Sequence, residues 1–216
     1  MVKIKICGLK RLEDIEIVNR YMPDYIGFVF VDSKRKVSHD LALELKNNLD
    51  SNIISVGVFV DAEIDEILDL YSSGIIEMAQ LHGSESEEYI RCLKEKTNYK
   101  LKIINAIEMS GSTDLSEFDE SLADFLLLDS GKGSGKTFDW SLIHKNLKKD
   151  FFLAGGIDIS NVGEATNQIM PYAIDLSSSL EINGYKDENK IKEIMEAIRW
   201  VKEDMVNMVV NTYLKH

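Results

Sequence analysis

The sequence predicts an α/β protein in which eight parallel strands close into one barrel surrounded by helices. Two observations favour this fold. Apolar, strand-like runs recur eight times, and a helical pattern separates most of them. The chemically notable residues stand where strands end, which is where a barrel of this kind has its active site. We therefore expect a single (β/α)8 TIM barrel over residues 1–216, with its active site at the C-terminal face.

The first expected strand alternates in side-chain character along residues 3–7. Ile4 and Ile6 face one side, and Lys5 and Cys7 face the other. This predicts that the two isoleucines pack under an outer helix and that Cys7 lies at the interior rim. An unpaired lysine inside a barrel is costly, so Lys5 needs an acidic partner. The candidates for that partner are Asp175 and Glu77.

The later strands are nearly continuous in Val, Ile, Leu and Phe, as parallel strands buried on both faces are. We expect strands at 3–7, 25–30, 53–60, 76–81, 101–106, 124–129, 151–154 and 172–176. We expect helices at 11–21, 38–49, 62–73, 85–96, 115–121, 139–148, 159–169 and 187–206. Ser38 and Ser84 are expected to cap the second and fourth helices. Apolar residues in 200–216 predict a C-terminal helical extension that packs on the barrel or on another subunit.

A doubly wound open sheet is the alternative arrangement of eight such units. It would gather the notable residues at one switch point, whereas here they follow several different strands.

Charge and composition exclude some partners. The net charge of -12 argues against nucleic acid or an anionic membrane as the main partner. No apolar run reaches ~18 residues and no secretory signal is evident, so we expect a cytoplasmic protein. Cys7 and Cys92 form no metal-ligand cluster, and each is expected to be a free thiol in a reducing compartment.

Small residues follow the last two expected strands. Gly155 and Gly156 follow the seventh, and Ser177 and Ser178 follow the eighth. These loops are the usual phosphate site of such a barrel, because bare backbone N–H groups hold the anion there. Each could be an ordinary tight turn, but together they predict a small phosphorylated substrate. Asp175, at the end of the eighth strand, is counted among the substrate-binding residues.

The loop after the sixth strand reads SGKGSGKT over 130–137. A nucleotide-binding P-loop would need glycine at the position of Ser130, so that interpretation fails. We expect a flexible lid whose Lys132 and Lys136 approach an anionic substrate.

Cys7 and Asp129 are a candidate acid–base pair at the ends of the first and sixth strands. A thiolate is a competent base, although a lone cysteine is more often a small core residue. Asp129 follows the buried run 126–128, so its carboxylate must be hydrogen-bonded, exposed or functional. Arg35 offers a guanidinium fork suited to a carboxylate on a planar ligand. His82 either orients a ligand or satisfies a hydrogen bond at the rim.

The sequence resembles the phosphoribosylanthranilate isomerase family of tryptophan biosynthesis. The matching segments lie in chain order from residue 3 to about 199, and KICG, GSGKTFDW and DLSSSLE are together specific. They are KICGL (5–9), IGFVF (26–30), SKRKVS (33–38), VGVFV (56–60), QLHG (80–83), LLLDS (126–130), GSGKTFDW (133–140), LAGGI (153–157), DLSSSLE (175–181) and GYKD (184–187). Three positions depart from the family pattern, namely Lys34, Ser179 and Asn183.

The resemblance implies an Amadori rearrangement of N-(5-phosphoribosyl)anthranilate to 1-(2-carboxyphenylamino)-1-deoxyribulose 5-phosphate, with no metal and no cofactor. It implies that Cys7 is the general base and Asp129 the general acid. It also implies that Arg35 holds the anthranilate carboxylate. The residues implied to contact phosphate are Gly156, Ser177 and Ser178.

Two other functions stay open. One is the related histidine-pathway isomerase, which is expected to use carboxylates at both catalytic positions, so that Cys7 counts against it. The other is a non-catalytic barrel that binds a phosphorylated ligand. We expect a monomer, with a homodimer as the alternative.

Overall fold

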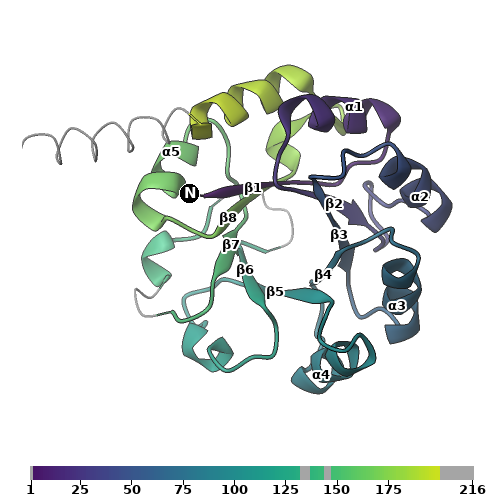
Figure 1. Ribbon diagram of the computed structural model, residues 1–216. Coiled ribbons are helices and arrows are strands. Elements are labelled where there is room, and N and C mark those ends of the chain that lie inside the picture. The colour runs from purple at the N-terminus through teal and green to yellow at the C-terminus, as the bar shows by residue number, and fades with distance from the viewer. Residues whose placement is uncertain (1, 132–136, 144–146, 200–216) are drawn as a thin grey trace, which may run out of the picture.

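The computed structural model describes residues 2–131, 137–143 and 147–199, and in it eight parallel strands close into a barrel ringed by helices (Figure 1). Each strand pairs in parallel with the next, and β8 pairs with β1. The strands are β1 (Lys3–Cys7), β2 (Tyr25–Val29), β3 (Ile54–Phe59), β4 (Met78–Leu81), β5 (Lys102–Glu108), β6 (Phe125–Asp129), β7 (Phe151–Leu153) and β8 (Ala173–Leu176). All eight predicted strands and the predicted closed barrel are confirmed.

Five of the predicted helices are present as regular α-helices. They are α1 (Leu12–Tyr21), α2 (His39–Asn47), α3 (Ile64–Ser72), α4 (Glu87–Lys96) and the helical residues 188–199. The Ser38 hydroxyl accepts a hydrogen bond from the Leu41 N–H, as a cap should. The prediction of Ser84 as the cap of α4 is wrong: Ser86 fills that position and accepts from the Tyr89 N–H. The predicted extension over 200–216 lies outside the described residues.

The helices predicted after β5 and β6 are wrong in the described part of the chain. The first is only the 3-10 turn η1 (Leu115–Phe118), and the second is the 3-10 turn η2 (Trp140–Leu142). In both turns the side chain of the preceding aspartate, Asp114 or Asp139, accepts a hydrogen bond from the backbone N–H of the serine two residues after it. Each aspartate therefore caps the start of its turn, as Ser38 caps α2, but the turn does not continue as an α-helix over the described residues.

The helix predicted after β7 is present in altered form. It is one α-helical turn, α5 (Val162–Glu164), which continues as the π-helical segment η3 (Ala165–Ile169). Residue Met170 closes it in the left-handed conformation, with φ of 50°.

The interior of the barrel is layered as the alternation of β1 predicts. Ile4 and Ile6 are buried in the core between strands and outer helices. On the other face, Lys3 donates to the Tyr172 hydroxyl at the bottom of the barrel, and Cys7 packs with Val58 near the mouth. The strand phase derived from the sequence is therefore correct.

A short hairpin, which we did not predict, follows β8. The 3-10 turn η4 (Ser178–Leu180) leads into β9 (Glu181–Ile182), which pairs antiparallel with β10 (Tyr185–Lys186). Asn183 and Gly184 connect them with φ of 53° and 78°. Two consecutive residues with positive φ are typical of a type I′ turn, for which Asn-Gly is the preferred sequence.

Among the described residues, no helix is long and apolar enough to cross a membrane.

Candidate active site

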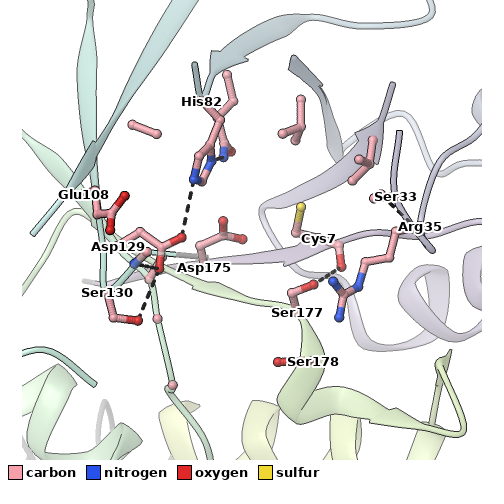
Figure 2. A pocket seen from close by; sticks show the side chains of 18 of the residues that line it. Cys7, Ser33, Arg35, His82, Glu108, Asp129, Ser130, Asp175, Ser177 and Ser178 are labelled. Carbon is pink, nitrogen blue, oxygen red and sulfur yellow. Dashed lines mark hydrogen bonds and ion pairs between the residues drawn. The ribbon is translucent and has the colours of Figure 1, made fainter. Parts of the chain in front are cut away.

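The residues predicted for the site gather in one cavity of about 780 Å³ at the C-terminal ends of the strands (Figure 2). The predicted residues that line it are Cys7, Arg35, His82, Asp129, Gly155, Gly156, Asp175, Ser177 and Ser178. The order of the strands places β1 and β6 three strands apart around the ring, so Cys7 and Asp129 lie on different sides of the mouth. The lysines predicted in the lid, Lys132 and Lys136, lie outside the described residues.

Cys7 is a free thiol at the end of β1 and is 8% exposed. It packs between Val29 and Val58. Burial raises the pKa of the Cys7 thiol, and the nearby ammonium groups of Lys5 and Lys186 oppose that rise. The thiol therefore lies among apolar side chains, and two ammonium groups are near enough to lower its pKa in part.

A glycine on the neighbouring strand makes room for the thiol. Gly27 is the register partner of Cys7, and a Cβ added to it would lie 2.6 Å from the Cys7 sulfur. Real Cβ atoms do not approach that closely, so any other residue at position 27 would push the thiol aside. The glycine of the IGFVF segment is thus a steric requirement of the site.

Lys5 lies one layer below Cys7 and has no exposed surface. Its ammonium donates to both carboxylate oxygens of Asp175, at 3.0 and 2.9 Å, and the two residues are register partners on β1 and β8. Burial disfavours the Lys5 charge, but Asp175 outweighs this effect and raises the pKa of Lys5. The predicted acidic partner is thus Asp175. Glu77 instead contacts Lys46.

On the other side of the mouth, His82 contacts the carboxylate of Asp129. The Nε2 atom of His82 lies 3.5 Å from Oδ2 of Asp129, and Nδ1 lies 3.1 Å from the amide nitrogen of Gln80. An amide nitrogen can only donate, so Nδ1 accepts and the neutral imidazole carries its proton on Nε2. Gln80 thereby directs the N–H of His82 toward Asp129.

Arg35 does not point its fork into open solvent. Its Nε and Nη2 atoms donate to the two oxygens of Glu181, at 2.6 and 3.0 Å. The Arg35 side chain also lies over Gly8, since a Cβ at that glycine would be 2.4 Å from its Cδ. The remaining terminal nitrogen, Nη1, takes no part in the hydrogen bonds to Glu181.

The hairpin also places the buried ammonium group of Lys186 against the Glu181 carboxylate that binds Arg35. Lys186 is 4% exposed, and its ammonium donates to Glu181 at 3.0 Å and to the backbone carbonyl of Ser177 at 2.9 Å. Burial acts to raise the pKa of Glu181, but the hydrogen bond from Arg35 and the charge of Lys186 outweigh it and lower the pKa to about 2. The Ser177 hydroxyl in turn donates to the Cys7 carbonyl, at 3.1 Å.

The two glycines after β7 adopt backbone conformations that favour glycine. Gly155 and Gly156 have φ of 82° and 63°. A Cβ at Gly155 would lie 2.4 Å from the Ser130 hydroxyl oxygen and 2.9 Å from Oδ1 of Asp129. The loops after β6 and β7 therefore touch beside Asp129. Within the described residues, the Ser179 hydroxyl is buried at the cavity without a hydrogen-bond partner.

Sequence reasoning missed Glu181, Lys186 and Gln80 as parts of the site. The Asn183-Gly184 pair was a signal for the hairpin that carries the first two. The signal for Gln80 was its place at the start of the QLHG segment, two residues before His82. Among the described residues, no group of three or more His, Cys, Asp or Glu side chains is arranged to hold a metal ion.

A closed (β/α)8 barrel with a thiol and a carboxylate around its C-terminal mouth, and with glycine and serine loops after β7 and β8, defines the class of barrel enzymes that act by acid–base catalysis on small anionic substrates. The family model for N-(5'-phosphoribosyl)anthranilate isomerase matches residues 4–197. The chain belongs to this family.

Related proteins of known sequence or structure match this chain over nearly its whole length. The N-(5'-phosphoribosyl)anthranilate isomerase of Endomicrobium trichonymphae is 45% identical over 204 residues, which cover 92% of this chain and 99% of that protein. A structure described as monomers of the dimeric phosphoribosylanthranilate isomerase from Thermotoga maritima is 34% identical with a TM-score of 0.81, covering 92% of this chain and 99% of that one. A phosphoribosylanthranilate isomerase in complex with reduced 1-(o-carboxyphenylamino)-1-deoxyribulose 5-phosphate has 33% identity and a TM-score of 0.81, at the same coverage.

Proposed function

We propose that the chain catalyses the reaction of its family, with Cys7 as the general base and Asp129 as the general acid. The reaction is the Amadori rearrangement of N-(5'-phosphoribosyl)anthranilate to 1-(2-carboxyphenylamino)-1-deoxyribulose 5-phosphate in tryptophan biosynthesis. The observation that supports the two roles is that the Cys7 thiol and the Asp129 carboxyl line the same cavity from β1 and β6. A ribose held between them would meet one group on each side.

The proposed steps follow from this arrangement. Asp129 gives its proton to the furanose ring oxygen, the bond from that oxygen to C1′ breaks, and an iminium forms. The Cys7 thiolate then takes the proton from C2′ to give an enolamine, which tautomerises to the ketone product. Protons are only moved, so the reaction is an isomerisation that needs no oxidant or reductant.

His82 is assigned to the acid side of the site. The N–H of its Nε2 faces Asp129, and Gln80 holds this tautomer. A donor in this position orients the Asp129 carboxyl toward the ring oxygen. It also stabilises the negative charge that Asp129 carries after it has given up its proton. Asp175 is assigned to the floor of the site, where its ion pair with Lys5 leaves it lining the cavity below the ribose.

The two anionic ends of the substrate are assigned to two different parts of the mouth. The phosphate is assigned to the loops that hold Gly155, Gly156, Ser177 and Ser178, and the phosphorylated ligand named for the related structure supports this site. The anthranilate carboxylate is assigned to Arg35. Since Glu181 already takes Nε and Nη2, the carboxylate is expected at Nη1.

The test of this function uses the intrinsic fluorescence of the substrate. Freshly made phosphoribosylanthranilate should lose its fluorescence when the purified chain is added, and the product should have the same mass as the substrate. A chain that binds the product analogue but leaves the fluorescence unchanged would instead be a non-catalytic phosphate-binding barrel.

The cellular location is proposed from the chemistry of Cys7. Cys7 must be a free thiol to act, which a reducing compartment maintains, and this supports the cytoplasm as the location. For the oligomeric state we propose a monomer. The Thermotoga maritima relative is described as dimeric, so a homodimer is the alternative that sedimentation of the purified chain would detect.

A further inference from the structure

Asn161 is the N-cap residue of α5, and its side-chain amide forms two hydrogen bonds with the loop after β7. The Nδ2 atom donates to the Gly156 carbonyl at 2.9 Å, and Oδ1 accepts from the Asp158 N–H at 3.0 Å. The amide thus joins both ends of the segment from Gly156 to Asp158. Asn161 itself is not among the described residues that line the cavity, and the proposed reaction gives it no role.

The side chain of Asn161 does not act as a helix cap. A capping side chain accepts a hydrogen bond from a backbone N–H two or three residues further along the helix. The side chain of Asn161 makes no such bond to α5 and reaches back to the loop instead. Starting the helix therefore does not account for the amide at this position.

The two bonds to the loop require an amide. The Gly156 carbonyl needs a donor and the Asp158 N–H needs an acceptor, and an amide offers one of each. The same contacts fix the orientation of the amide, because the reverse orientation would place donor against donor. Aspartate at position 161 would keep the acceptor and lose the donor, and alanine would lose both.

The segment that Asn161 holds begins at two glycines, which have little conformational restraint of their own. Gly155 and Gly156 have φ of 82° and 63°, and without a Cβ they can leave this conformation at little steric cost. A peptide unit is planar, so fixing the Gly156 carbonyl also fixes the direction of the Ile157 N–H. The Ile157 side chain is buried in the core and anchors the same segment from the other side.

The N–H groups of this segment are available to a ligand. In the part of the chain that the structure describes, the N–H groups of Gly155, Gly156 and Ile157 donate no hydrogen bond, and all three residues line the cavity. Backbone donors of this kind bind anions. Donors that are already held in one arrangement bind more tightly, because less conformational freedom is lost when the anion arrives.

We propose that Asn161 is a positioning residue that holds the loop after β7 in the conformation that receives the substrate phosphate. The proposal rests on the proposed function, which assigns the phosphate to this loop. The phosphate is remote from the reacting carbons, so the loop holds it equally in the ground and transition states. The contribution of Asn161 should therefore appear in KM and in ligand affinity, with little effect on kcat.

The experiment compares two ligands that differ only in the phosphate group. Calorimetry measures the dissociation constants of the reduced product analogue and of the same compound after its phosphate has been removed. Asn161→Ala should bind the analogue roughly five- to tenfold more weakly, the net effect of about one hydrogen bond. It should bind the dephosphorylated compound as the wild type does. The KM for the substrate should rise by a similar factor, with kcat changed by less than about twofold.

Ser160→Ala is the matched control. The Ser160 hydroxyl lies in the same loop but donates to the Asp158 carboxylate rather than to Gly156, so this variant should leave both dissociation constants unchanged. Asn161→Asp is the second test variant, because aspartate is a good N-cap residue and keeps the acceptor for the Asp158 N–H. It should also weaken binding of the analogue. It replaces the alanine variant if circular dichroism shows that Asn161→Ala does not fold.

Three results would overturn the proposal. Equal affinity of wild type and Asn161→Ala for the analogue would show that the loop does not depend on Asn161. Equal weakening of both ligands, or the same loss in Ser160→Ala, would make Asn161 a general structural anchor. A kcat that collapses while KM stays unchanged would place its effect on the chemistry instead.

The same measurements separate this proposal from the proposed function. If the wild type turns over the substrate but binds the two ligands equally, the phosphate lies elsewhere and the role of Asn161 is rejected while the reaction stands. If Asn161→Ala shows the loss that is selective for the phosphate but the wild type has no turnover, the role of Asn161 stands and the proposed reaction is rejected.

Discussion

Glu181, on a hairpin 146 residues further along the chain, accepts hydrogen bonds from Nε and Nη2 of Arg35, at 2.6 and 3.0 Å. The pair joins the loop after β2 to the hairpin after β8. It also limits how a substrate carboxylate reaches Arg35, because the fork is already filled and the ligand must use Nη1. Arg35 is thereby fixed in place before any ligand arrives.

Arg35→Ala should weaken substrate binding more than turnover. A carboxylate remote from the reacting carbons is held equally in the ground and transition states, so its loss raises KM with little change in kcat. Steady-state kinetics measure both. Arg35→Lys is the control that keeps a positive charge without the fork, and it should also raise KM. A collapse of kcat with KM unchanged would show that Arg35 acts on the chemistry.

Glu181→Gln should destabilise the protein by about 3 kcal/mol at pH 7, the size expected when one partner of a buried ion pair is removed. The pKa of Glu181 is lowered to about 2, so its stabilising contribution is present above the ordinary pKa of a glutamate and is lost as the pH falls toward 2. Urea unfolding at pH 7 and pH 3 should show the difference between wild type and variant shrinking in acid. An equal difference at both pH values would contradict the ion pair.

Cys7→Ser should lower kcat by at least ~10²-fold, the low end of what a positioned base contributes. Serine keeps the shape of the side chain, but its hydroxyl is essentially never ionised near neutral pH. Binding of the reduced product analogue, measured by calorimetry, should survive because phosphate and carboxylate are held elsewhere. Near-normal kcat would mean that the base is misassigned, and loss of binding would mean that the thiol is structural.

Asp129→Asn should lower kcat by a similar factor, since the amide has no acidic proton to give to the ring oxygen. The loss in the double variant with Cys7→Ser should be smaller than the product of the two single losses, because ring opening and removal of the C2′ proton are successive steps and the slower one limits kcat. Kinetics of the two single variants and the double variant measure this. Full multiplicativity would place both residues in a single rate-limiting step, contrary to the proposed order of steps.

Gly27→Ala should reduce kcat without abolishing folding. The added Cβ would lie 2.6 Å from the Cys7 sulfur, so the thiol must move away from its place at the mouth. Gly163→Ala is the control, because nothing lies within 4 Å of a Cβ there, and kcat should not change. Equal kcat in both variants would show that the position of the thiol is not critical.

The alternation of residues 3–7 was enough to predict the face of each side chain in β1. Period-two geometry leaves no freedom once one face is apolar, so the depth of Lys5 and the rim position of Cys7 follow from it. The eight buried strands were likewise predictable from their continuous apolar runs. The helices after β5 and β6 were not: capping residues are present at Asp114 and Asp139, but each is followed by only a short 3-10 turn among the described residues.

The nine residues predicted for the site could be named together from the sequence because the barrel places every strand end at one mouth, and all nine line the cavity there. Which of them touch was decided only by the tertiary structure. That Glu181 would bind Nε and Nη2 of Arg35, and that Lys186 would be buried beside Ser177, depends on a hairpin that packs against the loop after β2. Its turn residues were visible in the chain. Its partner was not, because contacts between residues 146 positions apart arise from how the barrel closes and leave no periodic trace in the sequence.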